Sequence, residues 1–139
     1  MNLIDKQLKE EIVKAFKTLF DFDLSASEFE LQPTRKEFEG THTLVVFPYL
    51  RQTKKGPEQS GEAIGEYLKE HSPIVSAYNV VKGFLNLSIG ESAWVNVLQN
   101  ISAEPSFGQY EPTGEKVMVE FSSPNTNKPL HLGHLRNNF

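Results

Sequence analysis

The sequence predicts an α+β fold in which helices pack against a mostly antiparallel four-stranded sheet, followed by the truncated start of a second domain. Apolar residues recur at helical spacing over residues 3–20 and again over 58–70. Two pairs of short apolar segments, each broken by turn residues, have the length and composition of strands. The order helix, strand, strand, helix, strand, strand, helix is typical of helices that cover an antiparallel sheet.

The elements follow one another with turn residues between them. After the first helix we expect strands at residues 28–32 and 42–47, a polar loop at 51–57, a helix at about 58–70, strands at 74–81 and 84–89, and a helix at 91–102. In the last helix, Trp94, Val95 and Leu98 are expected to face inward.

Residues 103–115 are rich in proline and glycine and have little periodicity, so we expect a linker between domains 1–102 and 116–139 there. An apolar run from Lys116 predicts a buried strand, which a Ser-Ser-Pro-Asn turn ends before a short helix begins. This strand has no neighbour in the chain. We therefore expect residues 116–139 to be disordered or to pair with another chain.

The composition excludes several classes of protein. The chain has 139 residues, no cysteine and a net charge of −4, which argue against disulfides, thiolate metal sites and general polyanion binding. Contact with RNA would need a local basic patch, or stacking and shape recognition. No run approaches the ~20 apolar residues of a membrane span, and the N-terminus lacks the apolar core of a signal peptide. Together these features predict a cytoplasmic protein without membrane contact.

A strand, a polar turn and the start of a helix form a place where phosphate can meet backbone N–H groups. In the predicted helix near the end of the chain, His131 and His134 would lie on one face, and Gly133 between them would let a flat ring approach the backbone. Two other interpretations are a pair of solvated histidines and a zinc site. A zinc site needs at least one more ligand, and none is nearby in the sequence.

One run of residues ends in two histidines: Glu120-Phe-Ser-Ser-Pro-Asn-Thr-Asn-Lys-Pro-Leu130, followed by His131-Leu-Gly-His134. This run resembles the nucleotide-binding signature of class I aminoacyl-tRNA synthetases in its arginyl version. The resemblance implies that residues 116–139 open a Rossmann-type catalytic domain that is incomplete in this chain. It also extends upstream to the appended N-terminal domain that docks on the tRNA elbow, near the D-loop. The matching features are Val46-Phe47-Pro48-Tyr49, the 58–70 helix, Gly83-Phe84-Leu85-Asn86 and Phe107-Gly108.

The reaction that the resemblance implies is activation of arginine by ATP, with Mg²⁺, and transfer of arginine to its tRNA. The implied ATP-binding residues are Pro129, His131, Gly133 and His134, the arginine-binding residues are Glu120, Ser123, Asn125 and His134, and the catalytic residues are His131, His134 and Lys128. Glu120 would meet either the α-amino group or the guanidinium of arginine. Without the surrounding motif, we would interpret Glu120 as an exposed strand residue and Lys128 as a solvated turn residue. We expect the parent enzyme to be a monomer, and the 139-residue chain alone to be inactive and to bind no cofactor.

Phe84 and Asn86 alternate along one strand face, where a ring and an amide could stack on and read an unpaired base. The competing interpretation is that Phe84 is an ordinary core residue. The predicted tRNA-binding residues are Phe47, Tyr49, Arg51, Lys54, Lys55, Phe84 and Asn86, with Arg35 and Lys36 as further members of the basic patch.

Two other functions remain open from the sequence. The chain could be a free-standing RNA-binding or protein-interaction domain without ligase activity. It could also be a small phosphotransfer enzyme built on His131 and His134, although it lacks the sheet that would hold such a site.

Overall fold

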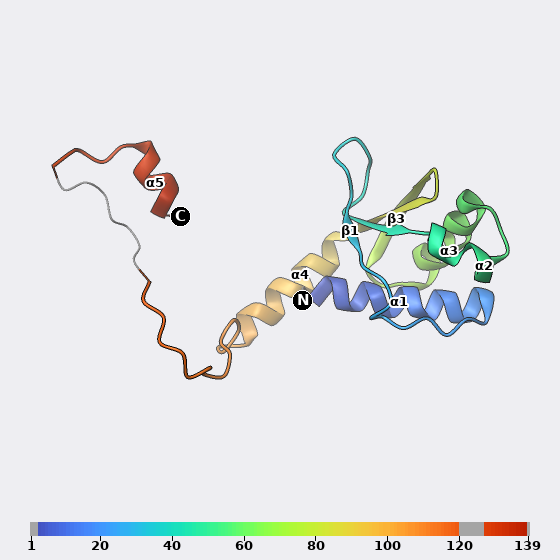
Figure 1. Ribbon diagram of the computed structural model, residues 1–139, viewed down its shortest axis with the longest axis horizontal. Coiled ribbons are helices and arrows are strands. Elements are labelled where there is room, and N and C mark those ends of the chain that lie inside the picture. The colour runs from blue at the N-terminus through green and yellow to red at the C-terminus, as the bar shows by residue number, and fades with distance from the viewer. Residues whose placement is uncertain (1–2, 120–126, 139) are drawn as a thin grey trace. The chain divides into compact units, whose positions relative to one another are not determined.

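The computed structural model describes residues 3–119 and 127–138 (Figure 1). The chain divides into two compact units, Met1–Phe107 and Gly108–Phe139. Among the described residues, the four strands and the helices α1 to α4 belong to the first unit, whereas the second contains the short helix α5 (Leu132–Asn138). The boundary between the two units falls inside the predicted linker.

The first helix, α1 (Leu3–Phe20), forms where its apolar period predicts it. Its buried side includes Leu8, Ile12 and Phe16, which recur every four residues as one face of a helix requires. The helix ends at Phe20, and Asp21 follows with a positive φ of 48° while its N–H donates to the Lys17 carbonyl. The sheet is tied to this helix by His42, whose Nε2 lies 3.0 Å from Asp5 Oδ1.

The sheet has four antiparallel strands in the order β1-β2-β4-β3. The strands are β1 (Gln32–Pro33), β2 (His42–Val45), β3 (Val75–Val81) and β4 (Phe84–Ile89). This arrangement confirms the predicted α+β fold with a four-stranded antiparallel sheet. Because β4 is paired on both sides, each of its residues faces a partner on β2 or β3.

Helix α3 (Pro57–His71) packs against the sheet and α1, and two glycines set how close it comes. A Cβ at Gly61 would lie 2.8 Å from a methyl of Val80, and a Cβ at Gly65 would overlap the ring of Tyr78. Both positions therefore need a residue without a side chain for the helix to approach β3 this closely.

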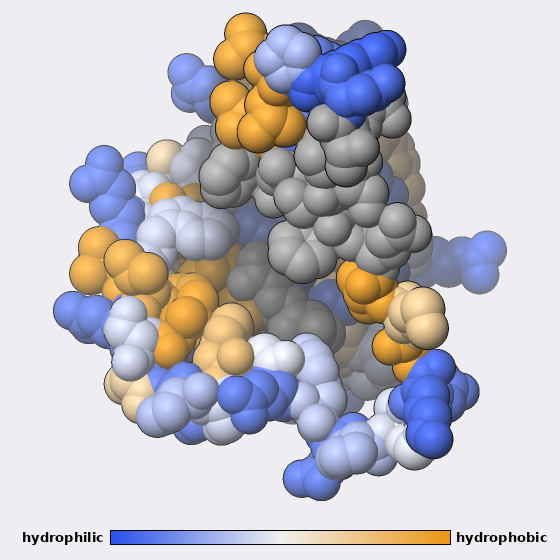
Figure 2. Space-filling model, turned by 90° about the vertical axis from the view of Figure 1, so that its left-hand side faces the viewer, coloured by the Kyte–Doolittle hydropathy of each residue, from blue (hydrophilic) through white to orange (hydrophobic). Residues whose placement is uncertain are grey.

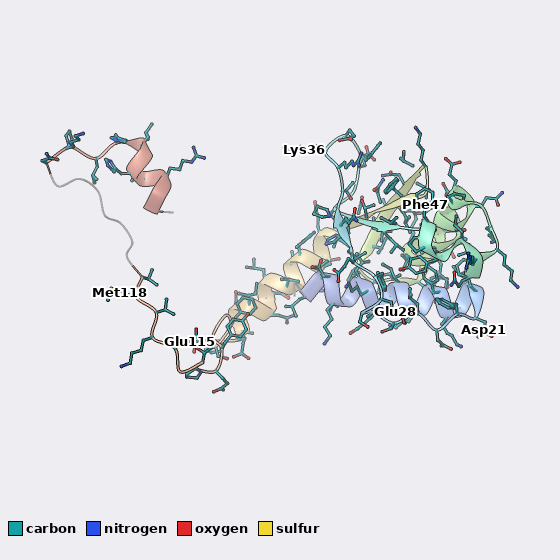
Figure 3. The ribbon with its side chains drawn as sticks, in the orientation of Figure 1. Asp21, Glu28, Lys36, Phe47, Glu115 and Met118 are labelled. Carbon is teal, nitrogen blue, oxygen red and sulfur yellow. The ribbon has the colours of Figure 1, made fainter. Side chains whose placement is uncertain are left out.

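The core lies between the helices and one face of the sheet, where Leu44, Leu85 and Leu87 are almost completely buried. The opposite face carries Thr43, Phe84 and Asn86, because neighbouring residues of a strand point to opposite sides. The β1–β2 loop projects beyond the sheet in Figure 1, and Figure 3 shows Lys36 at its tip.

The turn between β3 and β4 consists of Lys82 and Gly83, both with positive φ (49° and 81°). Two such residues suit a tight hairpin between right-twisted strands. Gly83 is also crowded, because a Cβ there would lie 2.8 Å from both Phe47 Cζ and Pro57 Cβ.

The strand predicted at residues 28–32 is wrong for most of its length, since β1 covers only Gln32–Pro33. The preceding segment packs against α1 instead of beside β2. Phe29 is buried in the core, and the ammonium group of Lys9 lies 5.4 Å from its ring centre and 3.5 Å from Glu30 Oε1.

The prediction that a strand continues to Phe47 is also wrong, because β2 ends at Val45. A 3-10 helix, η1 (Phe47–Tyr49), follows, and Pro48 within it has no N–H for a strand ladder. The predicted loop at 51–57 instead contains the short helix α2 (Leu50–Thr53), which ends at Lys54 in the left-handed conformation.

Helix α4 (Glu91–Ala103) forms as predicted, but the expectation for its buried face is wrong. Ala93 and Val97 contact the core, while Trp94, Val95 and Leu98 are 41%, 51% and 63% exposed. A helical apolar pattern indicates an apolar face but not which of its residues will find a partner. Other exposed hydrophobic side chains lie between hydrophilic ones on the face drawn in Figure 2.

The strand predicted from Lys116 is absent from the part of it that the structure describes, because residues 116–119 lie in no strand. A strand requires a neighbour for its backbone hydrogen bonds, and the second unit provides none among its described residues.

The close approach of α3 to β3 gives a test of the packing. We expect Gly65→Ala to lower the free energy of unfolding by about 1–3 kcal/mol, because the new methyl group overlaps the Tyr78 ring. In a Tyr78→Ala background the same change should be neutral or stabilising, since alanine is favoured over glycine inside a helix by about 1 kcal/mol. Urea unfolding of the four variants measures both effects, and equal losses in the two backgrounds would contradict this packing.

Candidate functional site

A pocket of about 240 Å³ lies on the open face of the sheet, beside the β1–β2 loop. Its lining combines an aromatic ring from the loop (Phe38), one from β4 (Phe84), an amide (Asn86) and two cations (Arg35 and Lys82). The other lining residues are Gln32, Pro33, Thr43 and Val81. Pockets for drug-sized molecules occupy about 300–1,000 Å³, so this one suits a smaller group.

Asn86 differs from the other predicted site residues because it is only 1% exposed. Its Oδ1 accepts a hydrogen bond of 2.6 Å from the Thr43 hydroxyl, and its Nδ2 donates one of 2.9 Å to Asn79 Oδ1. The amide lies on the predicted face of the strand but is bonded to its neighbours and almost completely buried. Asn86 can meet a ligand only within the pocket that it lines, and its role in tRNA binding stays a prediction.

Phe84 lies at the rim of the pocket and is 36% exposed, so it is not an ordinary core residue. Its ring meets the ring of Phe47 edge to face, with 5.8 Å between the ring centres. Phe47 is 46% exposed and also lines a shallow groove with Lys82 and the start of α3. The structure thus brings Phe47 of η1 against Phe84 of β4, the strand that also carries Asn86 (Figure 3 labels Phe47).

Tyr49 does not join this surface in the same way. Its ring packs edge to face on Phe16, 5.1 Å between centres, and its side chain is half-buried against the core. Burial raises the pKa of the Tyr49 hydroxyl, and the negative charge of Glu28 adds to this effect. Tyr49 is therefore a neutral packing residue in the structure, and its predicted contact with RNA is untested.

The predicted cations are exposed and divide into two groups. Arg51, Lys54 and Lys55 lie on α2 and the segment that joins it to α3, and Lys55 Nζ lies 6.0 Å from the centre of the Phe20 ring. Arg35 and Lys36 lie in the β1–β2 loop, and Arg35 lines the pocket. The structure does not bring the two groups into one cluster by any contact among the described residues.

Sequence reasoning predicted Arg35, Phe84 and Asn86 but missed the other residues of the pocket, among them Phe38 and Lys82. Phe38 is the one aromatic residue in the charged run from Arg35 to Glu39, which was a signal that it has a packing or binding role. Lys82 precedes a glycine in a hairpin turn directly before Phe84, so its side chain had to lie near the end of that strand.

The second unit contains the two histidines, whose ring centres lie 4.0 Å apart. The His131 Nδ1 accepts a hydrogen bond from the Gly133 N–H, and the His134 Nδ1 accepts one from the His131 N–H. A ring nitrogen that accepts a hydrogen bond carries no proton, so in both rings Nε2 is the donor. A Cβ at Gly133 would lie 2.9 Å from the His131 ring, which explains why glycine suits this position.

Glu120, Ser123 and Asn125 lie outside the described residues, so their predicted arginine-binding roles stay predictions. Lys128 and Pro129 are exposed in the turn before α5. Within residues 3–119 and 127–138, no group of three or more His, Cys, Asp or Glu side chains could hold a metal ion. None of the helices in those ranges is both long and apolar enough to cross a membrane.

Two family models match successive parts of the chain. Residues 96–139 match the family model of the class I (R) tRNA synthetase catalytic domain, and residues 4–89 match that of the arginyl tRNA synthetase N-terminal domain. The chain is 55% identical over 138 residues to an arginine–tRNA ligase of Phocaeicola vulgatus, which covers 97% of this chain and 23% of the relative. An arginine–tRNA ligase of Parabacteroides distasonis is 50% identical over 138 residues, with 98% and 23% covered.

A solved structure, arginyl-tRNA synthetase of Thermus thermophilus, superimposes with a TM-score of 0.56 and 25% sequence identity, covering 97% of this chain and 21% of that one. The match of residues 96–139 to the catalytic-domain model gives the class, that of class I aminoacyl-tRNA synthetases. Within it, the chain belongs to the arginyl-tRNA synthetase N-terminal domain family. The chain spans about a quarter of the length of the curated relatives it matches, 23%.

The buried position of Asn86 leads to a prediction about stability. We expect Asn86→Ala to lower the free energy of unfolding by about 1–3 kcal/mol, because it leaves the Thr43 hydroxyl and Asn79 Oδ1 without their partner. Phe84→Ala should cost less, since its ring is already one-third exposed. Thermal and urea unfolding compare the two variants. A smaller loss for Asn86→Ala than for Phe84→Ala would contradict this assignment.

Proposed function

We propose that this chain is the N-terminal part of an arginine–tRNA ligase, which activates arginine with ATP and transfers it to tRNA. In this proposal the first unit binds the tRNA elbow near the D-loop. The second unit contributes the start of the catalytic domain. The proposal is supported by the match of both units to parts of the same enzyme family and by relatives that share about half of their residues with the chain.

The observation that carries the RNA-binding role is the pocket on the open face of the sheet. Two rings, Phe84 and Phe38, offer surfaces on which an unpaired base can stack. The cations Arg35 and Lys82 beside them suit the phosphates that flank such a base, and Asn86 supplies polar groups at the base edge. A surface of this kind recognises a single unpaired nucleotide better than a duplex, whose bases are stacked.

For the second unit, we propose that His131 and His134 donate from Nε2 to oxygen atoms of ATP. Both Nδ1 atoms already accept backbone hydrogen bonds, which leaves each Nε2–H free to donate in this way. Lys128 would add a cation beside them, while Glu120, Ser123 and Asn125 would hold arginine. ATP is then a substrate of the whole enzyme, and Mg²⁺ would neutralise its phosphates. Catalysis would depend on positioning and on charge stabilisation.

The RNA-binding proposal is tested by titrating the 139-residue chain with an arginine-accepting tRNA and with a non-cognate tRNA at two salt concentrations. We expect binding to depend on salt, because cations contact the phosphates. We also expect binding to weaken when the D-loop is altered, because the unpaired base that the pocket accepts is lost. Equal binding to the cognate tRNA, the altered tRNA and an unrelated hairpin would contradict elbow recognition and favour general RNA binding.

The basic segment after α2 gives a second prediction. We expect Lys54→Glu combined with Lys55→Glu to weaken tRNA binding and to reduce the slope of log K against log salt by about 1 for each cation that contacts a phosphate. The control is Lys6→Glu combined with Lys14→Glu, which changes the net charge equally on α1. If both double variants weaken binding equally, net charge and not a local contact would explain the loss.

In the full-length enzyme, the signature gives a third prediction. We expect His134→Ala to lower the rate of arginine-dependent ATP–pyrophosphate exchange by about 10²–10³-fold, because a donor to the developing charge is lost. Asn at the same position, which retains an N–H donor, should recover part of the rate. Unchanged tRNA affinity in both variants is the internal control, because His134 belongs to the second unit. A rate near that of the wild type in His134→Ala would refute this role.

A further inference from the structure

A chain of hydrogen bonds crosses the open face of the sheet from the start of the β1–β2 loop to its end. It runs from Thr34 to Thr43 (3.0 Å between the hydroxyl oxygens), from Thr43 to Asn86 (2.6 Å), and from Asn86 to Asn79 (2.9 Å). The last bond, 2.5 Å long, goes from Asn79 Nδ2 to the backbone carbonyl of Glu39. Three strands and both arms of the loop are therefore joined through polar side chains.

The direction of this chain is set at the Glu39 end. A backbone carbonyl only accepts, so Asn79 must present Nδ2 to it and Oδ1 to Asn86. Asn86 must then present Nδ2 to Asn79 and Oδ1 to Thr43. Turning the Asn86 amide over would bring two acceptors face to face at Asn79. Thr43 sets no such preference, because a hydroxyl group both donates and accepts.

These bonds use one hydrogen of the Asn86 Nδ2 and one lone pair of its Oδ1. Nδ2 can therefore donate one further hydrogen bond, and Oδ1 can accept one. Asn86 lines the pocket, whereas Asn79 does not. A ligand in the pocket therefore meets the donor and the acceptor of Asn86 in one fixed order, which Asn79 determines from outside the pocket.

We propose that Asn79 is a positioning residue that fixes the orientation of the Asn86 amide and thereby sets which nucleotide edge the pocket accepts. This inference rests on the proposed function, in that the ligand is an unpaired nucleotide of the tRNA elbow. An amide of fixed orientation discriminates between base edges that present donor and acceptor in opposite orders. An amide that can turn over accepts both.

The test measures dissociation constants of the full 139-residue chain for tRNA transcripts in which each unpaired elbow nucleotide is replaced in turn. Discrimination is the ratio between the weakest and the tightest transcript at one position. We expect the wild type to discriminate by at least about tenfold at one position, which corresponds to one good amide–base pair.

Asn79→Leu should reduce that ratio to below about threefold, because the Thr43 hydroxyl can pair with either end of the amide once the acceptor on Asn79 is gone. Asn79→Asp should retain the ratio, since a carboxylate still accepts from Asn86 Nδ2, although it can no longer donate to the Glu39 carbonyl and its charge weakens binding to all transcripts. Asn79→Ala replaces the leucine variant if that variant fails to fold.

Thr34→Val is the matched control. It breaks the same chain of bonds at the link between Thr34 and Thr43 without changing a residue that lines the pocket, and it leaves Asn79 to orient the amide, so discrimination should persist even though stability falls. If Asn79→Leu retains the discrimination of the wild type, or if Thr34→Val abolishes it equally, Asn79 has only a structural role and the inference is overturned. Absence of tRNA binding by the wild type would instead overturn the proposed function itself, so the two failures are distinguishable.

Discussion

The alternation of side chains along β4 is the constraint on which both the core and the candidate site depend. Leu85 and Leu87 point to the helices and are completely buried, while Phe84 and Asn86 point to the open face. Because the period of a strand is two, a shift of one residue in the pairing would exchange the two sets. Pairing on both sides, with β2 and β3, holds this register in place. Burial of Leu85 and Leu87 in the apolar core therefore fixes the face on which Phe84 and Asn86 lie.

The glycines next to this strand show how closely the surrounding elements must approach it. Gly40 has a φ of 129°, and a Cβ there would lie 3.2 Å from the Cβ of Asn86. The end of the β1–β2 loop thus lies directly on the strand that carries the amide. Directly before the first residue of β4, Gly83 lets Phe47 and Pro57 pack against the hairpin turn. Larger residues at these positions would move the loop and the aromatic rim away from the pocket.

Much of the first unit could be predicted from sequence because its signals are local. The apolar period gives α1 and α3, and the Lys82-Gly83 turn between two apolar segments gives the β3–β4 hairpin. The signature of the second unit was recognisable from its residues alone. The pocket was only half predicted, since Phe84 and Asn86 were expected on one face but the loop over that face was not.

The part of the pocket that was not predicted, the loop over the open face, depends on contacts between residues far apart in the chain. Asn79 reaches the carbonyl of Glu39 across 40 positions, and Thr43 reaches Asn86 across 43. No local pattern encodes such pairs, because an asparagine or threonine in a strand is equally compatible with solvent contact. The same reason explains the error in α4, where the apolar period was visible but the identity of the covered face depended on α1.

In the proposed complex with tRNA, affinity and specificity would have separate sources. The net charge of −4 disfavours long-range attraction of RNA, so binding would come from cations near the contact, such as Arg35 and Lys82, whose effect salt screens beyond about 10 Å. Those charges would contact phosphates, which are the same in every nucleotide. Sequence information would then come from the polar side chains of the pocket that hydrogen bonds hold in place, Asn86 and the Thr43 hydroxyl bonded to it. Because Asn86 is also a buried polar residue whose bonds stabilise the fold, changing what the pocket reads would also change the stability of the domain. A different specificity would therefore require coordinated replacement of Asn86 and Asn79, since replacing either residue alone leaves a buried donor or acceptor unpaired.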